Sequence, residues 1–107
     1  MGINTNIIIE GVNFTFYQVK NGSFTETRRI NELNMYDEWV DVNVTVVGFT
    51  NEIYAQDWQK AKFKDTRSVS LSFKKTDSEN TTLQEIYIKV YTELLKLDEF
   101  EGAEIIL

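Results

Sequence analysis

The chain has 107 residues and a formal net charge of −6, from 11 Lys and Arg against 17 Asp and Glu. One hydrophobic core fits this length, and the apolar fraction of 42% is enough to fill it, which excludes a wholly disordered chain. Cys and His are both absent, which excludes a disulfide framework, a thiolate zinc site, a cysteine nucleophile and a histidine general base. We therefore expect a single domain over residues 1–107 with no catalytic residues, no metal and no cofactor.

The first ten residues bear on where the protein works. They contain no basic segment, and their apolar run is three residues long. A secretory signal needs a basic start and a longer apolar segment, and a membrane-spanning helix needs about 20 apolar residues. We therefore expect a cytoplasmic protein that makes no contact with membranes.

Residues 7–20 predict the first strand, with one irregularity. Apolar residues occupy odd positions as far as Ile9 and even positions from Val12 onward. The change falls at Glu10-Gly11, where a β-bulge containing glycine would keep both sets of side chains facing the core. The sequence therefore predicts a bulge at Glu10-Gly11 inside a continuous strand.

A hairpin is predicted at Asn21-Gly22. Both central positions of a tight hairpin turn need positive φ, and Asn-Gly meets this requirement well. Residues 24–30 would form the returning strand. Many polar side chains on both of its faces are typical of an edge strand.

Residues 39–49 and 67–74 show the clearest strand patterns. In each segment apolar and polar residues alternate, as in a half-buried antiparallel strand. The expected core residues are Val40, Val42, Val44 and Val46 in the first segment and Val69, Leu71 and Phe73 in the second. The intervening segment 51–65 fits both a helix and a strand, and we expect a short helix that runs into an extended segment.

Residues 83–97 predict a helix. Thr82 and Glu85 have the spacing of a capping box, in which each side chain accepts a backbone N–H of the first turn. Residues 105–107 are expected to form a final short strand. The predicted fold class is α+β: a single domain with an antiparallel sheet of four or five strands, covered on one face by a long C-terminal helix.

The apolar side chains of this helix cover an unusually wide arc. The arc is about 200°, whereas a helix lying on one sheet needs a stripe of little more than about 100°. Ile88, Tyr91 and Leu95 flank the main stripe. Either segment 51–65 or the C-terminal strand packs against them, or they form an interface with another subunit or partner.

Positive charge is concentrated between Trp58 and Lys75. This segment has six cations and one acid, a net charge of +5, which leaves −11 for the rest of the chain. Its candidate contact residues are Trp58, Lys60, Lys62, Lys64 and Arg67. They could solubilise an edge strand, bind single-stranded nucleic acid, or bind the acidic segment 98–104 of another copy.

Nucleic acid is the less favoured of these partners. The charge of −11 elsewhere repels phosphate, so we predict no oligonucleotide binding at physiological salt. We predict instead that replacing Lys60 and Lys64 with Glu weakens contact with an acidic protein surface.

Asp37, Glu38 and Asp41 form the densest acidic group. Two carboxylates a few ångströms apart can hold a hard cation or share a proton. These residues lie at the entrance of the strand over 39–49, where we expect them to be solvated. The sequence therefore predicts no metal site here.

These observations favour a function in protein–protein contact. The small size, the acidity and the lack of His, Cys and Pro are compatible with small proteins of phages or mobile elements, although no motif identifies a family. The leading hypothesis is a non-catalytic interaction module that self-assembles, as a structural or accessory protein of a phage or mobile element. Its partner is another protein or further copies of itself. The alternatives are an acidic inhibitor that mimics nucleic acid, which requires a contiguous acidic face, and a weak single-strand binder through residues 58–75.

Overall fold

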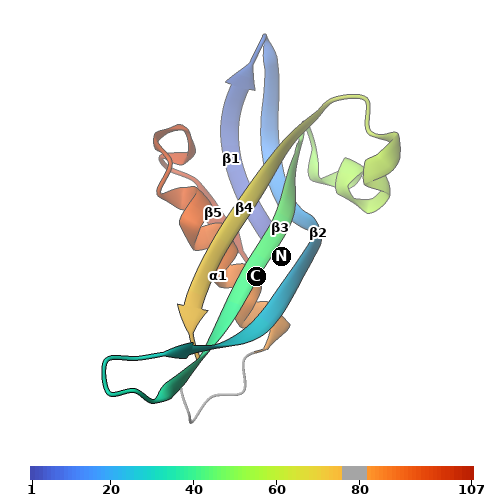
Figure 1. Cartoon of the computed structure of the whole chain (residues 1–107). Helices are drawn as coiled ribbons and strands as arrows, with labels where there is room; N and C mark the ends of the chain where they lie inside the picture. The colour runs from blue at the N-terminus through green and yellow to red at the C-terminus, as the bar shows by residue number, and fades with distance from the viewer. Residues whose placement is uncertain (76–81) are drawn as a thin grey trace.

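The computed structural model describes residues 1–75 and 82–107. It is an α+β domain with one five-stranded antiparallel sheet in the order β4-β3-β2-β1-β5 (Figure 1). The strands are β1 (Gly2–Ile9), β2 (Val12–Ile30), β3 (Tyr36–Phe49), β4 (Lys64–Lys74) and β5 (Glu104–Ile106). The helices are the 3-10 helix η1 (Glu52–Lys60), the α-helix α1 (Leu83–Leu95) and the 3-10 helix η2 (Asp98–Phe100). None of the helices in the described residues is long and apolar enough to cross a membrane.

The first hairpin turn lies at Glu10-Gly11. Both residues have positive φ, 49° and 80°, and Ile9 pairs directly with Val12. This is the two-residue turn that suits the twist of a hairpin. The predicted bulge at Glu10-Gly11 is therefore wrong. A two-residue turn puts Ile9 and Val12 on the same face of the sheet, and so changes the parity of the apolar positions just as a bulge would.

The predicted hairpin at Asn21-Gly22 is also wrong, because both residues lie inside β2. They pair with Thr45 and Val44 of β3, and the irregularity of the strand falls between Val19 and Asn21. A Cβ atom on Gly22 would overlap the Val44 side chain. Glycine is therefore needed at position 22, because a larger residue would not fit beside Val44. The bulge next to it adds one residue to β2, so that side chains at even and odd positions exchange faces of the sheet from there on.

The main core lies between α1 and one face of the sheet. The predicted core valines of β3 are all buried there: Val40, Val42, Val44 and Val46. The helix contributes Ile86, Val90, Tyr91 and Leu94. In β4, Val69, Leu71 and Phe73 pack against this core while the serines between them are exposed, as predicted.

Helix α1 begins as predicted and ends earlier. The Thr82 hydroxyl accepts a hydrogen bond from the Glu85 N–H at 3.2 Å, so the predicted N-cap is confirmed. The helix ends at Leu95 instead of Leu97 and has 13 residues, about 20 Å of length, in a molecule 53 Å long. The prediction of a long helix that covers a whole face is therefore not confirmed.

A second, smaller core lies on the opposite face. It consists of Phe16, Val47, Phe49 and Ala55, with Trp58 and Ala61 at its margin. Helix η1 supplies Ala55 and Trp58, and the chain then enters β4 at Lys64. The predicted short helix followed by an extended segment is confirmed, and the helix covers part of the face that α1 does not contact.

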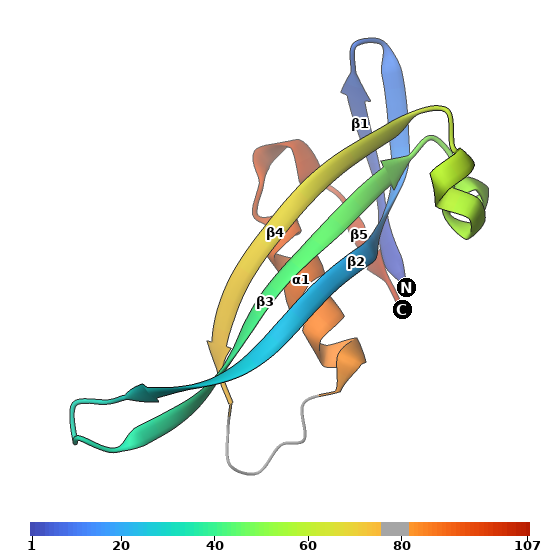
Figure 2. The ribbon, with the colours of Figure 1, turned by 45° about the vertical axis from the view of Figure 1, so that its right-hand side comes forward.

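Strands β2 and β3 extend beyond the rest of the sheet. Lys74 is the last residue of β4, and it pairs with Trp39. Past this point the strand pairs of the described residues join β2 with β3, from Arg28 with Glu38 to Ile30 with Tyr36, and the Lys75 N–H donates to the Glu38 carbonyl at 2.8 Å. The resulting two-stranded projection, residues 28–38, is called the hairpin arm below, and it is seen clearly in Figure 2.

Candidate interaction surfaces

The turn of the hairpin arm is fixed by its own hydrogen bonds. The Asn31 side-chain oxygen accepts from the N–H groups of Leu33, at 2.9 Å, and Met35, at 3.1 Å. The Asn31 N–H donates to the Met35 carbonyl at 2.8 Å. Asn34 has a φ of 58°, a left-handed conformation that asparagine tolerates. The hydrogen bonds of Asn31 therefore hold the turn in a defined shape.

This turn presents apolar side chains to solvent. The four residues of the arm tip are Ile30, Leu33, Met35 and Tyr36, which are 62%, 79%, 62% and 68% exposed. Single exposed apolar residues are common, but a contiguous group at the end of a projection is typical of an interaction site. The sequence pattern predicts only a connecting loop around residues 31–38. The available signal was the three apolar residues inside a short loop bounded by Asn31 and Asp37.

The acidic cluster at the base of the arm is engaged in a polar network. Asp41 accepts from Ser72 at 2.5 Å and pairs with Arg29 at 2.7 Å. The Ser72 hydrogen bond holds the pKa of the Asp41 carboxyl below its usual range, so this group stays charged. Asp37 pairs with Lys74 at 3.4 Å. Among the residues that the structure describes, no group of three acidic, His or Cys side chains is placed to hold a metal ion.

The predicted basic patch is divided between the two faces of the sheet. Lys64 lies over the Trp58 ring at 5.6 Å, on the side of the second core. Arg67 lies over the rings of Tyr17, at 5.7 Å, and Phe100, at 5.2 Å, on the side of the main core. Lys60 is exposed and pairs with Asp57, and Lys62 lies over the Phe63 ring at 5.4 Å. These cations therefore do not form one continuous surface for a phosphate backbone.

Arg67 instead belongs to an internal network that includes the acidic segment. Its guanidinium donates to Asp65 at 2.8 Å and also pairs with Glu99 of η2. The Tyr17 hydroxyl donates to Asp65 at 2.5 Å. The acidic segment 98–104 thus meets the predicted basic patch within one chain, through Glu99 and Arg67.

The Tyr17 hydroxyl predicts a loss of stability at alkaline pH. Burial raises its pKa well above the ordinary 10.0, and the hydrogen bond to Asp65 adds to this rise. Above about pH 10 the unfolded chain loses the tyrosine proton while the folded chain keeps it, so the free energy of unfolding falls as pH rises. Burial likewise raises the pKa of Tyr91. We expect Tyr17→Phe to make this decline shallower, measured as urea midpoints from about pH 8 to 11.5.

The exposed arm residue Tyr36 provides the matched control. Tyr36→Phe removes a phenol without touching the core, and the pH dependence of its urea midpoint is compared with that of Tyr17→Phe. Equal slopes for wild type and Tyr17→Phe would show that the Tyr17 proton is not linked to folding.

The candidate helix residues lie mostly against the chain itself. Tyr91 is 1% exposed, and its hydroxyl accepts from the Val19 N–H at 3.0 Å. Leu95 packs against the main core, which also includes Ala103 and Ile105 beside β5. Ile88 is half-buried. The C-terminal strand therefore shares a core with this side of the helix, and Tyr91 is a core residue that a partner could not reach.

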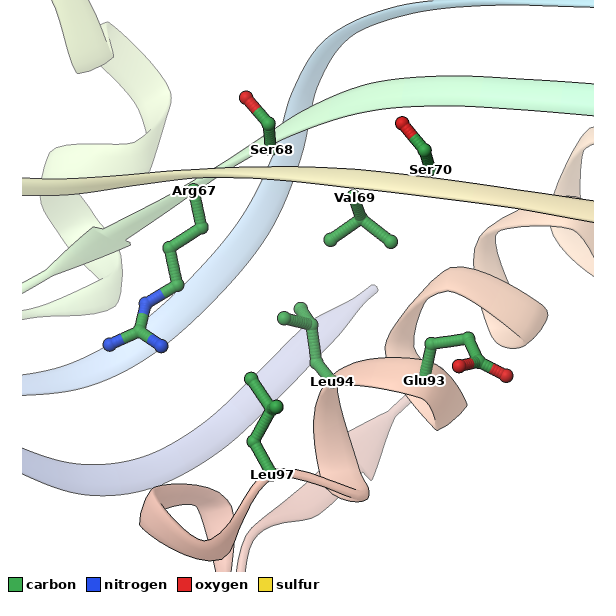
Figure 3. Close-up of a pocket in the computed structure, with 7 residues that line it drawn as sticks. All are labelled: Arg67, Ser68, Val69, Ser70, Glu93, Leu94 and Leu97. Atoms are coloured by element: carbon green, nitrogen blue, oxygen red, sulfur yellow. The ribbon is translucent and has the colours of Figure 1, made fainter.

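A groove runs between β4 and α1 (Figure 3). Val69 of β4 and Leu94 of α1 point toward each other across it, and Leu97 stands at its lower end, 45% exposed. The groove is completed by Arg67, Ser68, Ser70 and Glu93. We call it the β4 groove. It lies beside a strand whose outer edge pairs with no other strand in the described part of the chain.

Likeness to known proteins adds nothing to these surfaces. No protein-family model matches the chain, and comparisons with curated protein sequences and with solved structures found no match.

Proposed function

We propose that this protein is a non-catalytic protein–protein interaction module that makes contact through the tip of its hairpin arm. The observation that carries the proposal is the arm tip itself, four exposed apolar side chains on a turn of fixed shape. In this proposal the protein is a structural or accessory component of an assembly. Its small size and acidic composition are compatible with a protein of a phage or mobile element, which is the origin that we propose.

The arm tip is poorly explained by the stability of the chain alone. Burial of one such side chain contributes roughly 1.5–3 kcal/mol, and this free energy is not gained while the side chain is exposed. The arm extends past the end of β4, so its tip lies away from both cores. Burial against a partner would recover this free energy.

The two alternatives find less support. A nucleic-acid mimic needs a contiguous acidic face, but Glu26, Asp37 and Asp41 are each paired with a cation. A single-strand binder needs its cations on one surface, whereas Lys64 and Arg67 lie on opposite faces of the sheet. The arrangement of charge thus favours a protein partner.

Site-specific photo-cross-linking tests the arm. A photoreactive benzoylphenylalanine in place of Leu33 is expected to yield a covalent adduct heavier than the 12.5 kDa chain in cells of the native host. The adduct mass and its peptides show whether the partner is another copy or a different protein. Thr92, exposed on α1, is the control position and should yield no such adduct. Equal labelling at both positions, or none at Leu33, would refute the arm as the contact surface.

A further inference from the structure

The sheet has two open edges of different character. β4 is an outer strand with eleven residues, Lys64–Lys74, and no described strand pairs with its far side. At the other end of the sheet, β5 pairs only with residues 2–4 of β1, so the remainder of β1 has no strand on that side among the described residues. Unpaired N–H and C=O groups at such edges are a template for adding a further strand.

The two edges carry opposite charge. Exposed Lys64 and Lys74 stand at the two ends of β4. Residues 1–10 and 101–107, which form the opposite edge, contain three acids and no Lys or Arg. Two of these acids, Glu101 and Glu104, are exposed and line one shallow depression with residues 4–6 of β1. We call β5, with Glu101 and the open part of β1, the β5 edge.

The faces of the two edges also match. Ile105 of β5 and Val69 of β4 both pack on the main core, so the residues that alternate with them point to the opposite face. Glu104 is therefore on the same face of the sheet as Lys64 and Lys74. On the other face, the β4 groove offers Leu97, which is 45% exposed, beside the half-buried Val69. Apolar side chains are exposed at the β5 edge, where Leu107 is 73% exposed.

We propose that the β5 edge of a second copy of this chain docks against β4, so that the copies join head to tail into a continuous sheet. Every neighbouring pair of strands is antiparallel, which makes β4 and β5 run in the same direction. Across the sheet, Lys64 pairs with Phe49, Phe49 with Phe16, Phe16 with Asn4, and Asn4 with Glu104, so Lys64 and Glu104 lie level with each other. A copy added in the same orientation therefore places β5 alongside the start of β4, with Glu104 beside Lys64, and keeps α1 on the same face. Such a contact leaves one edge of each kind free and repeats, giving a ring or a filament.

The symmetric alternative, β4 against β4 about a two-fold axis at Val69, is disfavoured by charge. It would place Lys64 of each copy opposite Lys74 of the other, and like charges directly opposite each other destabilise a strand pair. The head-to-tail arrangement rests on the proposed function, since it specifies how such a module would assemble with itself.

Charge reversal at one edge at a time tests the pairing. Lys64→Glu with Lys74→Glu makes both edges acidic, and Glu101→Lys with Glu104→Lys makes both edges basic. In light scattering across concentration, the wild type should rise above 12.5 kDa and each double variant should stay at that mass. An equimolar mixture of the two variants should assemble again. The acidic β4 of one variant then meets the basic β5 edge of the other, and the basic β4 of the second meets the acidic β5 edge of the first. Added salt should weaken assembly.

A matched control changes the same charge away from both edges. Lys96 is exposed just after α1, and its replacement with Glu should leave assembly intact. Circular dichroism verifies that each variant is folded. Monomeric wild type at every concentration, or more assembly after Lys64→Glu with Lys74→Glu, would overturn the proposal; the second result would mean that the lysines protect a bare edge.

The two proposals fail in different ways. Assembly that survives both edge reversals but is lost in Leu33→Ser would refute edge pairing and leave the arm as the contact. Edge-dependent assembly without any cross-link at position 33 would refute the arm and leave the edge pairing in place. A mixture that stops at dimers would point to β4 against β4 and also overturn the head-to-tail contact.

Discussion

Replacing Val44 with Asp should unfold the domain. Val44 is 5% exposed, and in the sheet it lies between Gly22 of β2 and Val69 of β4, facing the main core. No cation neighbours this position in the sheet, and a buried carboxylate without a partner costs several kcal/mol, comparable to a total stability of about 5–15 kcal/mol. We expect the cooperative thermal transition to disappear or its midpoint to fall by tens of degrees.

The adjacent residue supplies the control. Asn43 is exposed on the other face, where its side-chain oxygen accepts a hydrogen bond from Ser70 at 2.6 Å. Asn43→Asp adds the same charge to the same strand and keeps an acceptor for Ser70, so its melting temperature should stay close to that of the wild type. A cooperative transition at the wild-type temperature in Val44→Asp would place Val44 outside the core.

Gly48→Ala is expected to cause the second largest loss of stability. Gly48 pairs with Tyr17, and a Cβ atom at this position would overlap the Tyr17 ring. The ring has no room to move, because it is fully buried, packs edge-on against Phe100 at 5.0 Å and donates a hydrogen bond to Asp65. Overpacking of this kind costs about 1–3 kcal/mol. The urea midpoint should fall accordingly.

A double-mutant cycle isolates the clash from other effects of the added methyl group. Tyr17→Leu removes the ring and is destabilising alone, but Gly48→Ala should cost much less in the Tyr17→Leu background than in the wild type. Additive losses in the cycle would show that the methyl group and the ring do not meet.

The sequence predicts an element well where the spacing of its apolar residues fits a strand but not a helix, or a helix but not a strand. Alternation in residues 39–49 and 67–74 places one side of each strand in the core, and both strands form as expected. The sequence predicts the first hairpin at Asn21-Gly22, whereas the structure has it at Glu10-Gly11. Asn21-Gly22 has the better turn chemistry, but its glycine is required by the Val44 side chain of a strand distant in sequence. Tertiary packing overrode the local preference.

The candidate surfaces show the same limit. Lys64 and Arg67 are three residues apart, so strand parity alone could have separated them onto opposite faces. The pairing of Arg67 with Glu99 and the burial of Tyr91 against β2 depend on how α1 and η2 return to the sheet. No pattern within either segment predicts that return. The sequence does not predict the arm tip as a contact surface, because residues 31–35 have neither helical nor strand periodicity.

The pairing of β5 with β1 has a consequence for how the molecule folds. Gly2 pairs with Ile106, so this contact joins residues roughly one hundred positions apart and carries a large loop-closure entropy. Contacts of such high sequence separation form slowly, whereas the connections between β2 and β3, residues 31–35, and between β3 and β4, residues 50–63, are far shorter. During synthesis β1 can pair with β2 early, but the outer edge of its residues 2–4 stays open until residues 104–106 have left the ribosome. Chains interrupted before β5 would therefore expose the paired part of β1 to aggregation.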